Sequence, residues 1–171
     1  MRQCLICGSN TIPFKTLYDD RFGYPGTFTV TSCAGCGHKS LGTGFTAEEL
    51  GKLYTDYYPR SRYSLDDYRP HGELSLFRAW LDGAKSQAFR LVPPNVRILD
   101  IGCGFGETLG YHRSRGCEVY GVEADENIRR VAERFGYNVC VGLFDPADYA
   151  PDYFDYVTMD QVLEHVTDPL R

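Results

Sequence analysis

The pattern of hydrophobic and polar positions changes character near Arg97. From there on, short apolar runs alternate with amphipathic stretches. We predict strands at 96–101, 118–123, 138–142 and 154–159. Helices are expected after the first two strands, the first closed by Gly116 and the second running over 126–135 with Asp125 as its N-cap. Strands alternating with helices favour an α/β fold with a Rossmann-like parallel sheet and right-handed crossovers.

The start of the chain has the pattern of a small β unit built around cysteines. Segments 11–19 and 26–33 are predicted strands, with Gly and Pro residues between them. The flanking sequences are two C-x2-C-G knuckles, formed by Cys4, Cys7, Cys33 and Cys36. Four thiolates at this spacing are typical of a tetrahedral structural zinc site in a zinc ribbon, with no open position for catalysis. Two disulfides are the alternative, which a reducing compartment disfavours.

The residues between the two halves predict helices. Residues 46–57 form a predicted helix with a capping box, Thr46 and Glu49, and residues 73–91 form a second one from the spacing of their apolar positions. Several tyrosines lie in or near the first helix. They fit either a lid over a ligand or ordinary packing: Tyr54, Tyr57, Tyr58 and Tyr63.

Charge limits the class of partner. The net charge is −5, and residues 97–171 carry 7 Arg/Lys against 14 Asp/Glu, whereas residues 1–96 carry 11 against 9. Nucleic acid is not the expected partner, because no Lys/Arg-rich run is present. Neither a membrane span nor the apolar core of a signal peptide is found, so a cytoplasmic location is the default expectation.

The stretch DIGCGFGE carries the main candidate for ligand chemistry. A dinucleotide loop would have its third glycine at position 107, where this chain has Glu107. Acids at Asp100 and Glu107 oppose a phosphate and favour a cation, and Glu123 ends the next predicted strand, where ribose hydroxyls would need a carboxylate. S-adenosylmethionine, with its sulfonium and ammonium groups, is such a ligand.

Together, LDIGCGFGE, VYGVEAD and FDYVTMDQVLEHVTDP resemble a class I S-adenosylmethionine-dependent methyltransferase over about residues 73–171. The resemblance implies a seven-stranded sheet, of which four strands are predicted here. It also implies cofactor contacts from the loop, from the end of the second strand and from the segments after the third and fourth strands. These residues are Asp100, Gly102, Cys103, Gly104, Gly106, Glu123, Ala124, Leu143, Phe144, Asp145, Asp160 and Gln161.

Glu164 and His165 follow the fourth predicted strand, where ligands of such sheets bind. His165 is a candidate base for a proton of the methyl acceptor, with Glu164 beside it; packing or capping at a helix start is the alternative. Some proteins with a similar motif hold a divalent metal with their Glu/His cluster, but Gln161 in place of an acid disfavours this here.

A zinc ribbon ahead of such a domain resembles methyltransferases of bacterial sugar and surface-polysaccharide pathways. We therefore expect methyl transfer to a small-molecule acceptor, a sugar or sugar-nucleotide. The alternatives are an RNA methyltransferase whose ribbon recognises substrate, and a non-catalytic cofactor-binding fragment. The sequence does not distinguish oxygen, nitrogen and carbon as the methylated atom.

Three parts are predicted along the chain: a zinc ribbon at 1–42, a helical linker or lid region at 43–95, and the N-terminal part of the methyltransferase domain at 96–171. An unpaired fourth strand would be an exposed edge. We therefore interpret the sequence as part of a longer chain, inactive by itself, or as a protein that completes its sheet by homo-oligomerisation.

Overall fold

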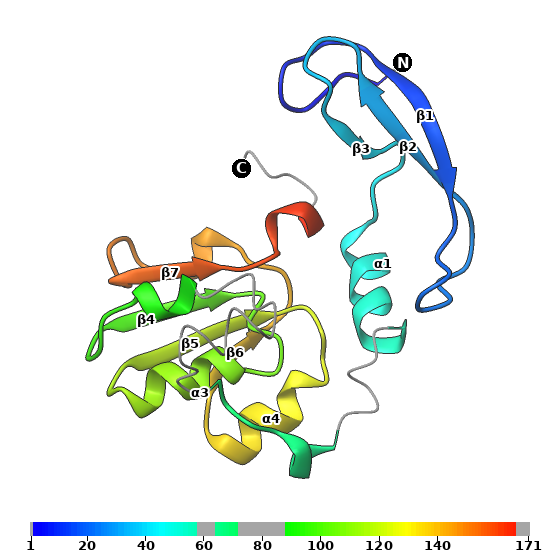
Figure 1. The fold of residues 1–171 in the computed structure, drawn as a ribbon. Helices are drawn as coiled ribbons and strands as arrows, with labels where there is room; N and C mark the ends of the chain where they lie inside the picture. Colours follow the sequence, from blue (N-terminus) through cyan, green and yellow to red (C-terminus); the bar gives the residue numbers. More distant parts are fainter. Residues whose placement is uncertain (1, 58–63, 72–87, 167–171) are drawn as a thin grey trace, which may run out of the picture. The chain divides into compact units, whose positions relative to one another are not determined.

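Four parallel strands form the sheet that carries the glycine loop (Figure 1). The computed structural model describes residues 2–57, 64–71 and 88–166. The strands are β4 (Arg97–Ile101), β5 (Glu118–Glu123), β6 (Asn138–Val141) and β7 (Tyr156–Met159), in the order β6-β5-β4-β7 with every neighbouring pair parallel. The predicted α/β class with a Rossmann-like parallel sheet is thereby confirmed.

Two helices connect the first three of these strands on one face of the sheet (Figure 1): α3 (Glu107–Ser114) and α4 (Ile128–Phe135). Helix α4 begins two residues later than predicted. The side chain of Asp125 accepts the backbone N–H of Asn127 at 2.9 Å, which forms a turn ahead of the helix. Gly136 then ends α4 in the left-handed conformation, with φ of 66°.

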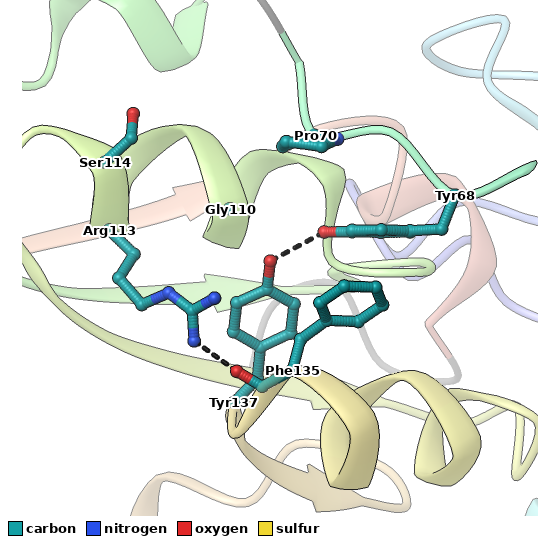
Figure 2. Close-up of a pocket in the computed structure, with 7 residues that line it drawn as sticks. All are labelled: Tyr68, Pro70, Gly110, Arg113, Ser114, Phe135 and Tyr137. Carbon is teal, nitrogen blue, oxygen red and sulfur yellow. Dashed lines mark hydrogen bonds between the residues drawn. The ribbon is translucent and has the colours of Figure 1, made fainter. Parts of the chain in front are cut away.

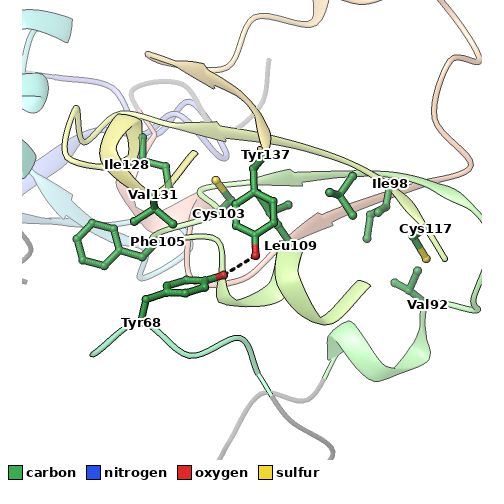
Figure 3. Packing of buried hydrophobic residues seen from close by; sticks show 11 residues of the cluster. Tyr68, Val92, Ile98, Cys103, Phe105, Leu109, Cys117, Ile128, Val131 and Tyr137 are labelled. Atoms are coloured by element: carbon green, nitrogen blue, oxygen red, sulfur yellow. Dashed lines mark hydrogen bonds between the residues drawn. The ribbon is translucent and has the colours of Figure 1, made fainter. Parts of the chain in front are cut away.

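The sheet has an apolar cluster on each face. Ile98 belongs to a cluster that also includes Leu109 of α3 and Val131 of α4 (Figure 3). Its neighbour Leu99 belongs to a second cluster with Ile101, because successive side chains of a strand point to opposite faces. Burial of such side chains contributes about 1.5–3 kcal/mol each to folding. These two clusters hold β4 in place between them, and the glycine loop begins at the end of this strand.

The cysteine-rich unit is a three-stranded antiparallel sheet in the order β1-β2-β3. Its strands are β1 (Thr11–Leu17), β2 (Phe28–Cys33) and β3 (Lys39–Leu41). The first two were predicted; β3 was not, since three residues give too short a pattern to recognise. A register shift between Pro13 and Lys15 interrupts the β1–β2 ladder.

Helix α1 (Ala47–Lys52) follows this sheet, and its predicted capping box is confirmed. Glu49 donates its backbone N–H to the Thr46 hydroxyl at 3.2 Å and accepts the Thr46 N–H at 2.8 Å. The helix then widens into a π-helical turn, Leu53–Tyr57. The Tyr57 ring packs edge-on against Tyr24 at 5.0 Å, which matches the packing interpretation of this tyrosine. Tyr58 and Tyr63 lie outside the described residues.

Short 3₁₀ turns complete the described elements: Leu65–Asp67, Ala88–Leu91, Pro146–Asp148 and Leu163–His165. The helix predicted over 73–91 lies outside the described residues except for its last four, which form one of these turns. Residues 1–59 and 60–165 belong to separate compact units. The finer division at 42/43 and 95/96 stays a prediction. Among the described helices, none has the length and apolar character that crossing a bilayer requires.

Candidate functional site

The four knuckle cysteines converge on one point. All four Sγ atoms lie within 4.8 Å of one another, with Cys4–Cys36 at 3.8 Å and Cys7–Cys33 at 3.4 Å. These separations are well beyond a disulfide bond of about 2.05 Å. Tetrahedral Zn–S bonds of about 2.3 Å would place the sulfurs about 3.8 Å apart. The donor set therefore fits a tetrahedral thiophilic metal.

Backbone amides face these sulfurs, as they do in thiolate sites. Gly35 and Cys36 donate their N–H groups to Cys33 Sγ at 3.3 and 3.4 Å. The N–H and hydroxyl of Ser9, followed by neighbouring sulfurs, lower the pKa of Cys7 to about 6. Donation to the charged form of a thiol favours the thiolate, which is the form that binds a metal.

The glycine loop leaves β4 and begins α3 in a conformation that requires glycine. Gly102, Gly104 and Gly106 have φ of 71°, 60° and 76°. Side chains cost about 1–2 kcal/mol in this left-handed region. The alternate glycines therefore let the backbone turn tightly from a strand into a helix without side chains on its surface.

Glu123, at the end of β5, closes this loop from the neighbouring strand. Its Oε2 accepts the N–H of Gly104 at 2.8 Å, and its Oε1 accepts the N–H of Asp125 at 2.9 Å. The side chain is 6% exposed. Each carboxylate oxygen thus accepts one backbone N–H, one from the glycine loop and one from the segment after β5. The predicted carboxylate thus lies directly against the loop.

Asp100 is also buried, but its carboxylate is held by protein hydroxyls. Thr108 donates to Oδ2 at 2.5 Å and Thr158 donates to Oδ1 at 2.7 Å. Burial raises the pKa of Asp100, against the lowering effect of these two donors; the negative charges of Asp160 and Glu123 raise it further. Asp100 therefore joins β4, α3 and β7 at the base of the loop.

The segment after β7 lies on the same loop. A Cβ on Gly102 would come within 2.5 Å of a Val162 methyl group, so the absence of a side chain there admits this segment. Asp160 and Gln161 precede Val162 and are exposed; Gln161 has φ of 54°. The structure thus brings the predicted residues after β7 close to the predicted loop.

Glu164 and His165 form part of the 3₁₀ turn Leu163–His165 and are exposed. The His165 N–H donates to the Val162 carbonyl at 2.8 Å, which ties the turn to the segment above Gly102. Both candidate catalytic side chains are therefore on the solvent side of the chain that borders the glycine loop.

The segment after β6 brings two aromatic rings together. Phe144 stacks on Tyr149, with ring centroids 6.0 Å apart and an interplanar angle of 20°. Tyr149 packs against the second core cluster. Burial, followed by electrostatic interactions with Cys140, Asp148 and Cys103, raises the pKa of Tyr149. The Leu143–Asp145 segment expected over adenine is thus anchored through Tyr149, which the sequence analysis did not single out.

Three further residues that contact Asp100 or the loop were not predicted from the sequence: Thr108, Thr158 and Tyr68. A threonine at an inward position of a strand or at the first turn of a helix is a weak signal, since its partner is set by tertiary contacts.

Ala124 and Cys103 are partly and fully buried, respectively, beside the predicted site; a Cβ on Gly121 would come within 2.7 Å of the Cys103 sulfur. This agrees with a small side chain chosen for space.

Comparison with known proteins identifies the family of the second unit. A family model described as a methyltransferase domain matches residues 69–171. The ubiquinone biosynthesis O-methyltransferase of Idiomarina loihiensis is 36% identical over 81 residues, which are 43% of this chain and 33% of the relative. That of Thiobacillus denitrificans is 32% identical over 111 residues, 60% of this chain and 45% of the relative. The chain spans less than half the length of each.

Solved structures with a similar arrangement include the 4+2 cyclase SpnF, with a TM-score of 0.49, 20% identity and coverage of 76% of this chain and 55% of that one. An S-adenosylmethionine-dependent methyltransferase from Geobacter sulfurreducens in complex with S-adenosyl-L-homocysteine has a TM-score of 0.36 and 21% identity, and the match covers 61% of this chain and 45% of that one.

The family match includes the whole of the parallel sheet, the glycine loop and the segment after β7. By this match, the chain belongs to the methyltransferase domain family and has the class I S-adenosylmethionine-dependent methyltransferase fold.

Proposed function

We propose that this chain carries the S-adenosylmethionine-binding part of an enzyme that methylates a small molecule. The observation that carries the proposal is the contact between Glu123 and the Gly104 amide, 2.8 Å long, which sets a buried carboxylate against a turn of three left-handed glycines. This arrangement supports a ligand with a ribose and a positive charge better than one with a diphosphate.

In this proposal different residues bind different parts of the cofactor. Glu123 accepts the ribose hydroxyls, with Ala124 beside it, and the Gly102–Gly106 backbone borders the methionine end. Phe144 lies near the adenine, and Asp160 and Gln161 line the pocket of the methyl group. Since both Asp100 oxygens already accept threonine hydroxyls, its contribution is to hold the loop and to make the site negative. Bound S-adenosylmethionine supplies an electrophilic methyl group on a sulfonium.

His165 is the proposed base for the acceptor proton, with Glu164 beside it. A neutral imidazole has one ring nitrogen that can accept a proton. The exposure of both side chains, next to the segment that borders the glycine loop, supports a role toward an acceptor that arrives from solvent.

For the acceptor we propose a hydroxyl group of a small molecule. The name shared by the curated relatives, ubiquinone biosynthesis O-methyltransferase, favours oxygen as the methylated atom. The sugar or sugar-nucleotide class rests on the zinc-ribbon resemblance of the sequence. The acidic charge balance of residues 97–171 supports a small molecule over RNA.

We also propose that the four-cysteine cluster holds a structural zinc ion. Sulfur separations of 3.4 and 3.8 Å and amides directed at Cys33 support this. Four thiolates fill a tetrahedral shell, so such an ion would stabilise the β1–β3 sheet and leave no position for a substrate.

Calorimetric titration of the purified chain with S-adenosylhomocysteine tests the cofactor site. Saturable binding is expected, and Glu123→Ala should raise the Kd about 10-fold or more, because a hydrogen-bonding charged group is lost. Glu133→Ala on the exposed side of α4 is the matched control and should leave the Kd unchanged. Equal Kd values for the two variants would refute the assignment of Glu123.

A further inference from the structure

A short segment that precedes β4 in the sequence, Tyr68–His71, contacts the end of the glycine loop and the start of α3. The hydroxyl of Tyr68 donates to the carbonyl oxygen of Gly106 at 2.8 Å and lies 2.7 Å from the hydroxyl of Tyr137. Figures 2 and 3 show the two hydroxyls meeting in front of α3. Three residues on, the His71 N–H donates to the Glu107 carbonyl at 3.0 Å. The segment Tyr68–His71 therefore lies along the first turn of α3.

The direction of these hydrogen bonds follows from the donor inventory. A carbonyl only accepts, so the single hydroxyl proton of Tyr68 is committed to Gly106. Tyr137 must then donate to the Tyr68 oxygen. The result is an ordered relay from Tyr137 through Tyr68 to the backbone of the loop. Burial, followed by the contact with Tyr137, raises the pKa of Tyr68, so the hydroxyl stays a neutral donor.

Packing leaves the relay little freedom. Tyr68 is 4% exposed and Tyr137 is 8% exposed. A Cβ on Gly110 would lie 2.6 Å from Pro70 Cβ and 2.7 Å from the Tyr137 hydroxyl, and one on Gly106 would lie 3.3 Å from the Tyr137 ring. The helix thus carries a glycine where the segment crosses it. No space is left for a side chain at Gly110, so the segment and the helix lie in close contact there.

A pocket of about 330 Å³ opens beside the relay (Figure 2). Arg113 borders it, with its guanidinium 4.4 Å from the centroid of the Tyr137 ring and a hydrogen bond to the Phe135 carbonyl. None of the predicted cofactor residues lines this pocket. The relay contacts the loop at Gly106, whereas Glu123 contacts it at Gly104 from β5.

We propose that Tyr68 is a positioning residue of the cofactor loop. Its hydroxyl, oriented by Tyr137, fixes the Gly106 carbonyl and with it the left-handed peptide that begins α3. The inference rests on the proposed function in one respect, namely that the cofactor occupies the Gly102–Gly106 loop. The Gly106 carbonyl also accepts the Gly110 N–H at 2.9 Å, so loss of the Tyr68 hydroxyl leaves it with one donor in place of two. The peptide is then held less firmly, which should weaken cofactor binding without removing any cofactor contact.

The test compares Tyr68→Phe with Tyr137→Phe in the full chain, using calorimetry with S-adenosylhomocysteine and thermal unfolding. Both variants lose one buried hydroxyl and should lose comparable thermal stability. Only Tyr68→Phe removes the bond to Gly106, so it should raise the Kd about 5- to 20-fold, whereas Tyr137→Phe should change it less than about 3-fold. Equal effects of the two variants on the Kd would overturn the proposal.

Nuclear magnetic resonance of the ligand-free chain separates this proposal from the cofactor assignment. The Glu107 amide shares its peptide unit with the Gly106 carbonyl, so its ¹⁵N shift should move in Tyr68→Phe and stay in Tyr137→Phe. An unchanged Glu107 shift in Tyr68→Phe contradicts the proposal even where wild type binds the ligand. Absence of wild-type binding with the expected shift change refutes the cofactor assignment instead.

A second variant covers the case in which Tyr68→Phe does not fold. Gly110→Ala adds a methyl group against Pro70 and both hydroxyls and should displace the segment from α3. It should raise the Kd in the same direction; a folded Gly110→Ala protein with wild-type affinity would overturn the inference.

Discussion

The Thr158 hydroxyl donates a 2.7 Å hydrogen bond to Asp100 across the register that pairs β7 with β4. Thr108 donates to the other carboxylate oxygen, at 2.5 Å. The buried acid at the base of the glycine loop is therefore held by a strand on one side and a helix on the other. Among the residues that the structure describes, its partners are two neutral hydroxyls and no ion pair.

Replacing Thr158 with valine should lower the free energy of unfolding by about 1–3 kcal/mol, since a buried carboxylate oxygen loses its donor while the side-chain volume is kept. Urea denaturation measures this. Thr158→Ser retains the hydroxyl, so it should recover more than half of the unfolding free energy that Thr158→Val loses. A valine variant as stable as wild type would show that the hydrogen bond contributes nothing.

Stability should fall in mild acid because of His112. Its side chain is fully buried, with neither ring nitrogen bonded to another described residue, and burial, with Arg115 as a second cause, lowers its pKa to about 4. The unfolded chain binds this proton near pH 6.5 and the folded chain does not. The contribution of neutral His112 to the free energy of unfolding is therefore fully present above pH 6.5. It decreases as the pH falls toward 4, and the total loss is about 3 kcal/mol.

Chemical denaturation at a series of pH values between 4 and 7 measures this effect. His112→Phe keeps an aromatic ring against Phe89 and Tyr111 and cannot bind a proton. The variant should show a flatter dependence on pH over that interval. Identical slopes for the variant and wild type would assign the acid sensitivity to other groups.

Gly102→Ala should damage the loop for two separable reasons. An alanine at φ of 71° costs about 1–2 kcal/mol, and its Cβ would lie 2.5 Å from a Val162 methyl. Thermal unfolding and S-adenosylhomocysteine affinity should both decrease. The double variant Gly102→Ala/Val162→Ala removes the clash and should recover part of the loss, and no recovery would mean that backbone strain accounts for all of it.

Metal analysis of the purified chain should find one zinc per molecule, and Cys4→Ser should reduce that content strongly, because a ligand is lost. Hydrogen exchange should then accelerate in β1–β3 and stay slow in β4 and β5. Cys140→Ser, an exposed cysteine outside the cluster, is the control and should retain the zinc. A metal-free wild-type chain with a protected β1–β3 sheet would exclude the structural ion.

Much of this architecture could be predicted because its signals are local. Apolar runs such as 96–101 and 118–123 predict strands, and their alternation with helices predicts a parallel sheet. The capping box of Thr46 and Glu49 involves residues three apart, so its pattern is complete in the sequence. The two C-x2-C-G knuckles likewise carry their ligand spacing within four residues each.

Only the tertiary structure decided which groups meet. The sequence offers Asp100 as an acid for a cation, but folding buries it and gives both oxygens to Thr108 and Thr158. It offers Tyr68 as one of thirteen tyrosines, and only the crossing of its segment over Gly110 brings it to Gly106. Periodicity and spacing describe neighbours along the chain, whereas hydrogen-bond partners distant in sequence depend on how strands and helices pack.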